Sequence, residues 1–204
     1  MASDHKFWDR MAKRYAKSPV SDEAAYQEKL RKTRAVLTPD SRVLEFGCGT
    51  GSTAIALAPH VQDYLATDIS GEMLAIARGE AEGIDNLRFE QKRLEGIAPP
   101  EGGFDAVLAH SVLHLLPDKE AAIAQAYALL KPNGVFISST TCMAKGGLLK
   151  PLLWAGNKLG LLPMVKFFSA DALVEAVQAA GFEIEERWQQ TPKAAVFLVA
   201  RKEG

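Results

Sequence analysis

Val43-Leu44-Glu45-Phe46-Gly47-Cys48-Gly49-Thr50-Gly51 is the stretch that decides the fold: an apolar segment, an acidic residue and three alternating glycines. A helix-forming run follows at once, from Ser52 to Ala58. Glycine adopts positive φ without strain, so a ligand can lie against bare main chain, and the N–H groups that open the next helix point at that ligand. The stretch therefore predicts a strand, a ligand-binding turn and a helix.

Short apolar segments alternate with helical patterns along most of the chain. The first helical pattern begins at Ser21, Asp22 and Glu23, a combination typical of a helix start. Alternation of this kind requires a parallel sheet with helices on both faces, and such sheets bind ligands at the carboxyl ends of their strands. We expect strands at residues 42–46, 64–69, 86–90, 104–109 and 135–139, with Lys131–Gly134 stopping a helix before the last of them.

The last part of the chain predicts a hairpin. A helix from Ser169 to Ala180 closes at Gly181, and two apolar segments follow at residues 182–186 and 195–200 with a short polar turn between them. A hairpin places one strand antiparallel to its neighbours. The expected fold is therefore α/β, a doubly wound, mostly parallel seven-stranded sheet with a C-terminal antiparallel hairpin.

Composition narrows the class of protein. A length of 204 residues with 48% apolar residues suits a single domain over residues 1–204. The 24 Lys and Arg residues balance 25 Asp and Glu residues, so no basic field favours nucleic acid as a partner. Cys48 and Cys142 lack the spacing of a metal site. The N-terminus is too charged for a signal peptide and no apolar run is long enough to span a bilayer, so we expect a cytoplasmic protein.

The pattern Glu45-x-Gly47-x-Gly49-x-Gly51, together with Asp68 at the end of the second expected strand, resembles motif I of the class I S-adenosylmethionine-dependent methyltransferases. The likeness extends over residues 21–204 and includes the reversed last strand of that Rossmann-like methyltransferase fold. It also includes three short phrases typical of the later motifs of the family: Phe104-Asp105, Leu113-His114 and Lys131-Pro132-Asn133-Gly134.

The resemblance implies S-adenosyl-L-methionine as cofactor and S-adenosyl-L-homocysteine as product. In the family the glycine turn passes the methionine part of the cofactor, and the acid after the second strand takes the two ribose hydroxyls. Many members carry a further acid after the third strand that touches the adenine amine, whereas this chain has Arg93 there, so adenine contacts must come from backbone or from elsewhere. The cofactor-binding residues implied are Tyr15, Glu45, Gly47, Cys48, Gly49, Gly51, Asp68, Ile69, Met73, Arg93, Leu94 and His110.

Two histidines are candidates for a general base. Methyl transfer from a sulfonium is an in-line displacement, and a neutral acceptor must lose a proton, for which imidazole has a suitable pKa. His110 ends the fourth expected strand, and His114 follows in a phrase that resembles the catalytic stretch of plant-type O-methyltransferases. Leu115 and Leu116 replace the Asp-Trp expected there. The alternative is that each histidine packs or hydrogen-bonds structurally.

Two segments outside the alternating pattern are candidate covers for the site. Residues 1–40 are expected to form N-terminal cap helices, and in related methyltransferases such a segment folds over the cofactor, which places Tyr15 in the pocket. The alternative is an amphipathic helix that covers the sheet edge. Residues 141–169 form an insert that is rich in Leu, Met and Trp and contains four lysines, Lys145, Lys150, Lys158 and Lys166, but no acid.

The insert is interpreted either as a lid for the acceptor or as a packing element whose lysines are solvated. A lid of this composition suits a small, apolar or amphipathic acceptor such as an acyl chain or a quinone, or weak contact with an anionic membrane surface. Two other functions stay open at this point. One is a non-catalytic module that binds S-adenosylmethionine. The other is a nicotinamide-dependent oxidoreductase, which is disfavoured because Ser52 stands where its fingerprint requires a third glycine.

Overall fold

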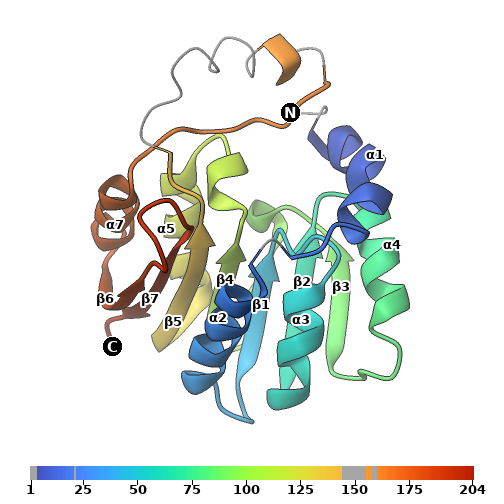
Figure 1. The fold of residues 1–204 in the computed structure, drawn as a ribbon. Helices are drawn as coiled ribbons and strands as arrows, with labels where there is room; N and C mark the ends of the chain where they lie inside the picture. Colours follow the sequence, from blue (N-terminus) through green and yellow to red (C-terminus); the bar gives the residue numbers. More distant parts are fainter. Residues whose placement is uncertain (1–3, 21, 144–154, 158–159) are drawn as a thin grey trace.

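The computed structural model describes residues 4–20, 22–143, 155–157 and 160–204 (Figure 1). Within these residues, seven strands form one sheet in the order β3-β2-β1-β4-β5-β7-β6. The first five strands pair in parallel, and β7 runs antiparallel to both β5 and β6. The predicted mostly parallel sheet with its C-terminal hairpin is confirmed. The strands are β1 (Arg42–Phe46), β2 (Asp63–Asp68), β3 (Leu87–Gln91), β4 (Phe104–His110), β5 (Leu130–Thr140), β6 (Phe182–Trp188) and β7 (Val196–Lys202).

Helices connect the strands, and most begin at a side chain that accepts a backbone N–H. Asp22, Ser70, Asp118 and Ser169 accept from the residue three positions on, which satisfies a donor that the first helical turn leaves free. The α-helices are α1 (Asp4–Ala16), α2 (Glu23–Ala35), α3 (Ser52–Leu57), α4 (Gly71–Glu80), α5 (Lys119–Leu129) and α7 (Ala170–Ala179). The short 3-10 helices are η1 (Ala58–His60), η2 (Leu94–Gly96) and η3 (Leu113–Leu115).

The sheet is buried on both faces, as its position between helices requires. One core joins strand residues such as Leu44 and Phe136 to α5 and α7, and the other joins strand residues such as Val43 and Ile137 to α2 and α3. Because side chains alternate along a strand, Glu45 lies on the same face as Val43, the one that α2 and α3 cover. In Figure 1 these two helices stand in front of the sheet, on either side of β1.

One boundary differs from the sequence-based expectation. Lys131–Gly134 do not lie between a helix and a strand, because α5 ends at Leu129 and β5 already pairs at Leu130. The four residues form an irregularity within β5, where the register with β4 shifts and Asn133 has a φ of 61°. The start of α2 agrees with the expectation at Glu23 with Asp22 as N-cap, and Ser21 lies outside the described residues.

The insert is described only in part. Residues 144–154 and 158–159, which include Lys145, Lys150 and Lys158, lie outside the described residues. Nothing in the structure therefore tests the interpretation of the whole insert as a lid. Among the helices that are described, none combines the length and the apolar character needed to cross a bilayer.

Candidate functional site

The three glycines after β1 all have positive φ, but they serve different purposes. A Cβ on Gly47 would lie 2.4 Å from Cγ2 of Val112, and one on Gly51 would lie 2.9 Å from Cε1 of Phe89. The only atom near a Cβ on Gly49 is Cε1 of Tyr15, at 3.8 Å. The bare backbone of Gly49 therefore faces open space, whereas the other two glycines allow close packing.

That space is part of a cavity of about 1400 Å³ at the carboxyl ends of the strands. Sites for a single small ligand usually enclose about 300–1,000 Å³, so the cavity has room for two molecules side by side. Gly51 does not line it, and a Cβ on Gly51 would instead meet Phe89 of β3 and Ala77 of α4. Its predicted contact with the cofactor stays a prediction. The other predicted site residues all line the cavity: Tyr15, Glu45, Gly47, Cys48, Gly49, Asp68, Ile69, Met73, Arg93, Leu94, His110 and His114.

Asp68, at the end of β2, ties the glycine turn to the start of α4. Its Oδ2 accepts the N–H of Gly49 at 2.9 Å, and its Oδ1 accepts the N–H of Ser70 at 2.8 Å. Burial raises the pKa of Asp68, while these backbone N–H groups oppose the rise. Each oxygen of a carboxylate can accept a second hydrogen bond, so Asp68 presents two acceptor positions to the cavity.

Glu45 is a buried carboxyl group within reach of the same cavity. Only 2% of the residue is exposed, and its Oε2 accepts a hydrogen bond from the hydroxyl of Tyr64 at 2.9 Å. Burial raises the pKa of Glu45 to about 8, and the negative charge of Asp68 adds to the rise. Glu45 therefore carries a proton at neutral pH and adds no full negative charge to the cavity.

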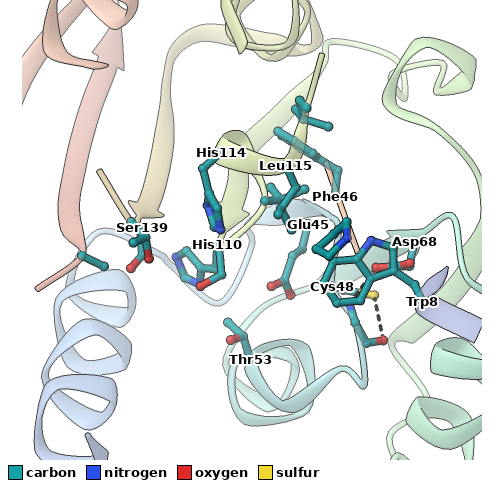
Figure 2. Close-up of a pocket in the computed structure, with 18 of the residues that line it drawn as sticks. Trp8, Glu45, Phe46, Cys48, Thr53, Asp68, His110, His114, Leu115 and Ser139 are labelled. Atoms are coloured by element: carbon teal, nitrogen blue, oxygen red, sulfur yellow. Dashed lines mark hydrogen bonds between the residues drawn. The ribbon is translucent and has the colours of Figure 1, made fainter. Parts of the chain in front are cut away.

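Helix α1 closes one end of the cavity. Asp9 accepts hydrogen bonds from Oγ of Ser70 at 2.6 Å and from the N–H of Glu72 at 3.3 Å, so α1 docks on the first turn of α4. Trp8 and Tyr15 line the cavity from α1, and Figure 2 shows Trp8 at the same end as Asp68 and Cys48. Trp8 was not predicted as a site residue, although its spacing of seven positions from Tyr15 places both on one helix face.

The opposite end of the cavity holds the two histidines and Ser139 (Figure 2). His110 of β4 pairs with Ser139 of β5, and His114 follows on η3. Within the described part of the chain, Nε2 of His110, Nδ1 of His114 and Oγ of Ser139 are buried without a hydrogen-bond partner. Two further buried atoms without a partner, Oγ of Ser138 and Oγ1 of Thr140, belong to residues that do not line the cavity. Buried polar atoms are rarely left unpaired, so the three atoms at the cavity could pair with a polar ligand group.

Both histidines are poor bases in this environment. Burial, followed by the nearby charge of Lys29, lowers the pKa of His110 to about 4, and burial also lowers the pKa of His114. They are neutral at pH 7 and can accept a proton, but each is a weaker base than an ordinary imidazole. Ser139 and Lys29, like Trp8, line the cavity without having been predicted from the sequence, because only the folded sheet brings β5 and α2 to this point.

An apolar wall borders the histidines. Leu115 and Leu116 follow His114, and Pro163–Val165 enter the cavity from the described end of the insert. The N–H of Lys166 donates to the carbonyl oxygen of His114 at 2.8 Å and holds this segment in place. Across the ranges that the structure describes, no three His, Cys, Asp or Glu side chains are grouped so that they could hold a metal ion.

Comparison with known proteins adds sequence and fold relatives. A family model described as a methyltransferase domain matches residues 12–187. The uncharacterized methyltransferase YcgJ of Bacillus subtilis (strain 168) is 33% identical over 100 residues, which are 48% of this chain and 40% of that protein. The ubiquinone biosynthesis O-methyltransferase of Acinetobacter baumannii (strain ACICU) is 27% identical over 153 residues, which are 71% of this chain and 65% of that protein.

A solved structure of a DhpI–SAH complex has a TM-score of 0.77 to this chain, with 24% identity over 99% of this chain and 96% of the other. At this level of identity the likeness concerns the fold. The chain spans 40% and 65% of the length of these two curated relatives.

Proposed function

The chain belongs to the class I S-adenosylmethionine-dependent methyltransferases, and on that premise we propose that it transfers the cofactor methyl group to a small, apolar or amphipathic acceptor. The observation that supports this most is the bare backbone of Gly49, which opens on the cavity beside Asp68. A turn without a side chain and a carboxylate with two acceptor positions fit the methionine part and the ribose diol of the cofactor. When bound, S-adenosylmethionine supplies a methyl group on a positively charged sulfur, which leaves by in-line displacement.

The residues of the chain contribute mainly by position. Gly47 and Gly49 would lie against the methionine part, Asp68 would accept the ribose hydroxyls, and α1 would cover them with Trp8 and Tyr15. Alignment of two reactants in one cavity can lower a barrier by roughly 7–11 kcal/mol, so no further catalytic group is required for a reactive acceptor.

His110 and His114 are the proposed general bases for an acceptor that must lose a proton. Removal of a base costs about 10²- to 10⁴-fold in rate, so His110→Ala and His114→Ala should each be compared with wild type on the acceptor found. If both variants keep the full rate, positioning alone accounts for transfer.

The apolar wall supports an acceptor with an apolar part. Leu115, Leu116 and Met164 face the cavity beside the histidines, and one relative is named for the biosynthesis of ubiquinone, a quinone. We propose that the insert over residues 141–169 acts as a lid above this wall. Replacing residues 145–157 with a short Gly-Ser linker should preserve the affinity for S-adenosylhomocysteine and lower acceptor turnover, and loss of both in an unfolded variant would assign the segment to the core.

The experiment that tests the cofactor site is a pair of glycine substitutions read by calorimetry. Gly49→Val should fill the space beside Asp68 and weaken binding of S-adenosylhomocysteine by at least about 100-fold, or about 2.7 kcal/mol. Gly83→Val is the matched control. Gly83 also has positive φ, a Cβ added to it would meet no atom within 4 Å, and Gly83 does not line the cavity. Wild-type affinity in Gly49→Val, with both variants folded, would remove the turn from the site.

A further inference from the structure

Lys29 is a cation of α2 that faces the histidine end of the cavity. Asp22, Ala25 and Tyr26 precede it at helical spacing, and all four side chains line the cavity. Lys29 and His110 line the same cavity. Burial lowers the pKa of His110, and the charge of Lys29 adds to this lowering. Figure 2 shows His110 and Ser139 next to each other at this end of the cavity.

The ammonium group of Lys29 forms no ion pair and no hydrogen bond with the residues that the structure describes, although it is half-buried. The two other basic residues nearest to it on α2 do form pairs: Arg31 with Glu28 at 2.7 Å, and Lys32 with both Glu28 and Glu186. Burial lowers the pKa of Lys29, and only the charge of Asp22 opposes this. A partly desolvated cation is costly unless a ligand supplies the opposite charge.

Two polar side chains that line the same cavity as Lys29 could form hydrogen bonds with the same ligand. Oγ of Ser139 and Nε2 of His110 are buried, unpaired and adjacent across β4 and β5. An oxyanion could accept hydrogen bonds from a hydroxyl, an imidazole N–H and an ammonium at once, and bonds of this charged kind are the stronger ones. Glu45 does not compete for the cation at neutral pH, because its carboxyl is protonated.

We propose that the acceptor is an oxygen acid, which is bound as an anion with Lys29 as its counter-ion and with His110 and Ser139 as hydrogen-bonding partners. The proposal rests on the proposed methyltransferase function and narrows its substrate class to ionised carboxylic or phosphonic acids with an apolar part. An ionised oxygen attacks with its own lone pair: the O–C bond forms as the C–S bond breaks, and the electron pair of that bond stays on sulfur, which becomes neutral. No proton has to be removed, so the weak basicity of both histidines is no obstacle.

The test compares acids with their neutral counterparts on the full chain saturated with S-adenosylhomocysteine. Benzoate and benzamide, octanoate and octanamide, and phenylphosphonate are titrated at millimolar concentration and followed by ligand-observed NMR. Wild type should bind the acids at least about tenfold more tightly than the amides. Lys29→Met should remove this preference, Lys29→Arg should retain it, and Lys13→Met should leave it unchanged, since Lys13 is exposed on α1 and does not line the cavity.

Three results would overturn the proposal: no acid binds, acids and amides bind equally to wild type, or the preference survives in Lys29→Met. The affinity of every variant for S-adenosylhomocysteine is measured first by calorimetry. If wild type fails to bind this compound, the proposed function itself fails. If wild type and Lys29→Met both bind it and acids still show no preference that depends on Lys29, only the assignment of the acceptor class is lost.

Discussion

Asp68 shows how one side chain can join three parts of a site. It accepts backbone N–H groups from the glycine turn and from the start of α4, and it faces the cavity with its remaining acceptor positions. A residue placed in this way shapes the turn and leaves acceptor positions for a ligand. Contact with the cofactor ribose, which the resemblance to motif I implies, stays a prediction, whereas the hydrogen bonds with Gly49 and Ser70 became apparent only in the folded chain.

Asp68→Ala should weaken binding of S-adenosylhomocysteine by at least about tenfold, because hydrogen bonds to a charged group contribute about 1.5–3 kcal/mol each. Asp68→Asn keeps one carbonyl oxygen as an acceptor, so its affinity for S-adenosylhomocysteine should fall less than that of Asp68→Ala. Asp63→Ala is the matched control at the opposite end of β2, where Asp63 pairs with Arg88. Calorimetry gives the affinities and circular dichroism the folding. A folded Asp68→Ala protein with wild-type affinity would contradict the assignment.

Glu45 predicts a specific dependence of stability on pH. The unfolded carboxyl ionises near its ordinary pKa of 4.5, but the folded one keeps its proton up to about pH 8. The folded state therefore binds one proton more between these values, and the free energy of unfolding falls as pH rises through this range. Over the interval from pH 5 to pH 8 the contribution of Glu45 is on the order of 3 kcal/mol.

Denaturant unfolding at pH 5 and pH 8 measures this contribution. Glu45→Gln keeps an acceptor for the Tyr64 hydroxyl but cannot ionise, so its stability should fall less between the two pH values than that of wild type. Glu80→Gln, an exposed substitution on α4, should behave as wild type. An equal fall in wild type and Glu45→Gln would show that the Glu45 carboxyl is ionised in the folded protein.

At the scale of elements, the docking of α1 on α4 can be tested directly. It is held to α4 by Asp9, and its Trp8 and Tyr15 form one wall of the cavity. Asp9→Ala removes both hydrogen bonds, worth about 1 kcal/mol each. The amides of α1 should then exchange faster with solvent, and the affinity for S-adenosylhomocysteine should fall by up to about tenfold.

Hydrogen exchange followed by mass spectrometry reports on α1 directly. The control is Asp40→Ala, an exposed acid that precedes β1 and does not line the cavity. Unchanged exchange in α1 together with unchanged affinity would mean that Asp9 does not hold the helix over the site.

The elements themselves were largely predictable, because their signals are local. Strand residues such as Val43 and Leu44 are buried on both faces, so they appear in the sequence as a continuous apolar run. Lys131–Gly134 misled the prediction since a Lys-Pro-Asn-Gly sequence is typical of a turn, and pairing with β4 extends the strand across it. The sequence could not distinguish the functions of the three glycines. Val112 packs against Gly47 and Phe89 packs against Gly51, and both approach from distant parts of the chain.

At the scale of the whole molecule, the order of the strands creates the site. The sheet brings β1, β2, β4 and β5 together so that the glycine turn, Asp68 and His110 face one cavity, and α2 adds Lys29 from outside the alternating pattern. No periodicity in the sequence marks Lys29 or Ser139: Ser139 is recognised by its buried, unpaired hydroxyl in the fold, and Lys29 by its place in the cavity lining. The family match decides against a nicotinamide-dependent oxidoreductase. Turnover assays on a broad panel of acceptors will distinguish an enzyme from a non-catalytic binding module.

A crystal structure of the chain with S-adenosylhomocysteine tests the central claim most directly, namely that the cofactor binds across the glycine turn and points its sulfur at the histidine end of the cavity. We predict that the ribose hydroxyls lie within hydrogen-bonding distance of Asp68, that the homocysteine part lies against Gly47 and Gly49, and that the sulfur faces the space between His110, Ser139 and Lys29. Density for the ligand elsewhere, or in the opposite orientation with its sulfur toward Trp8, would contradict this account.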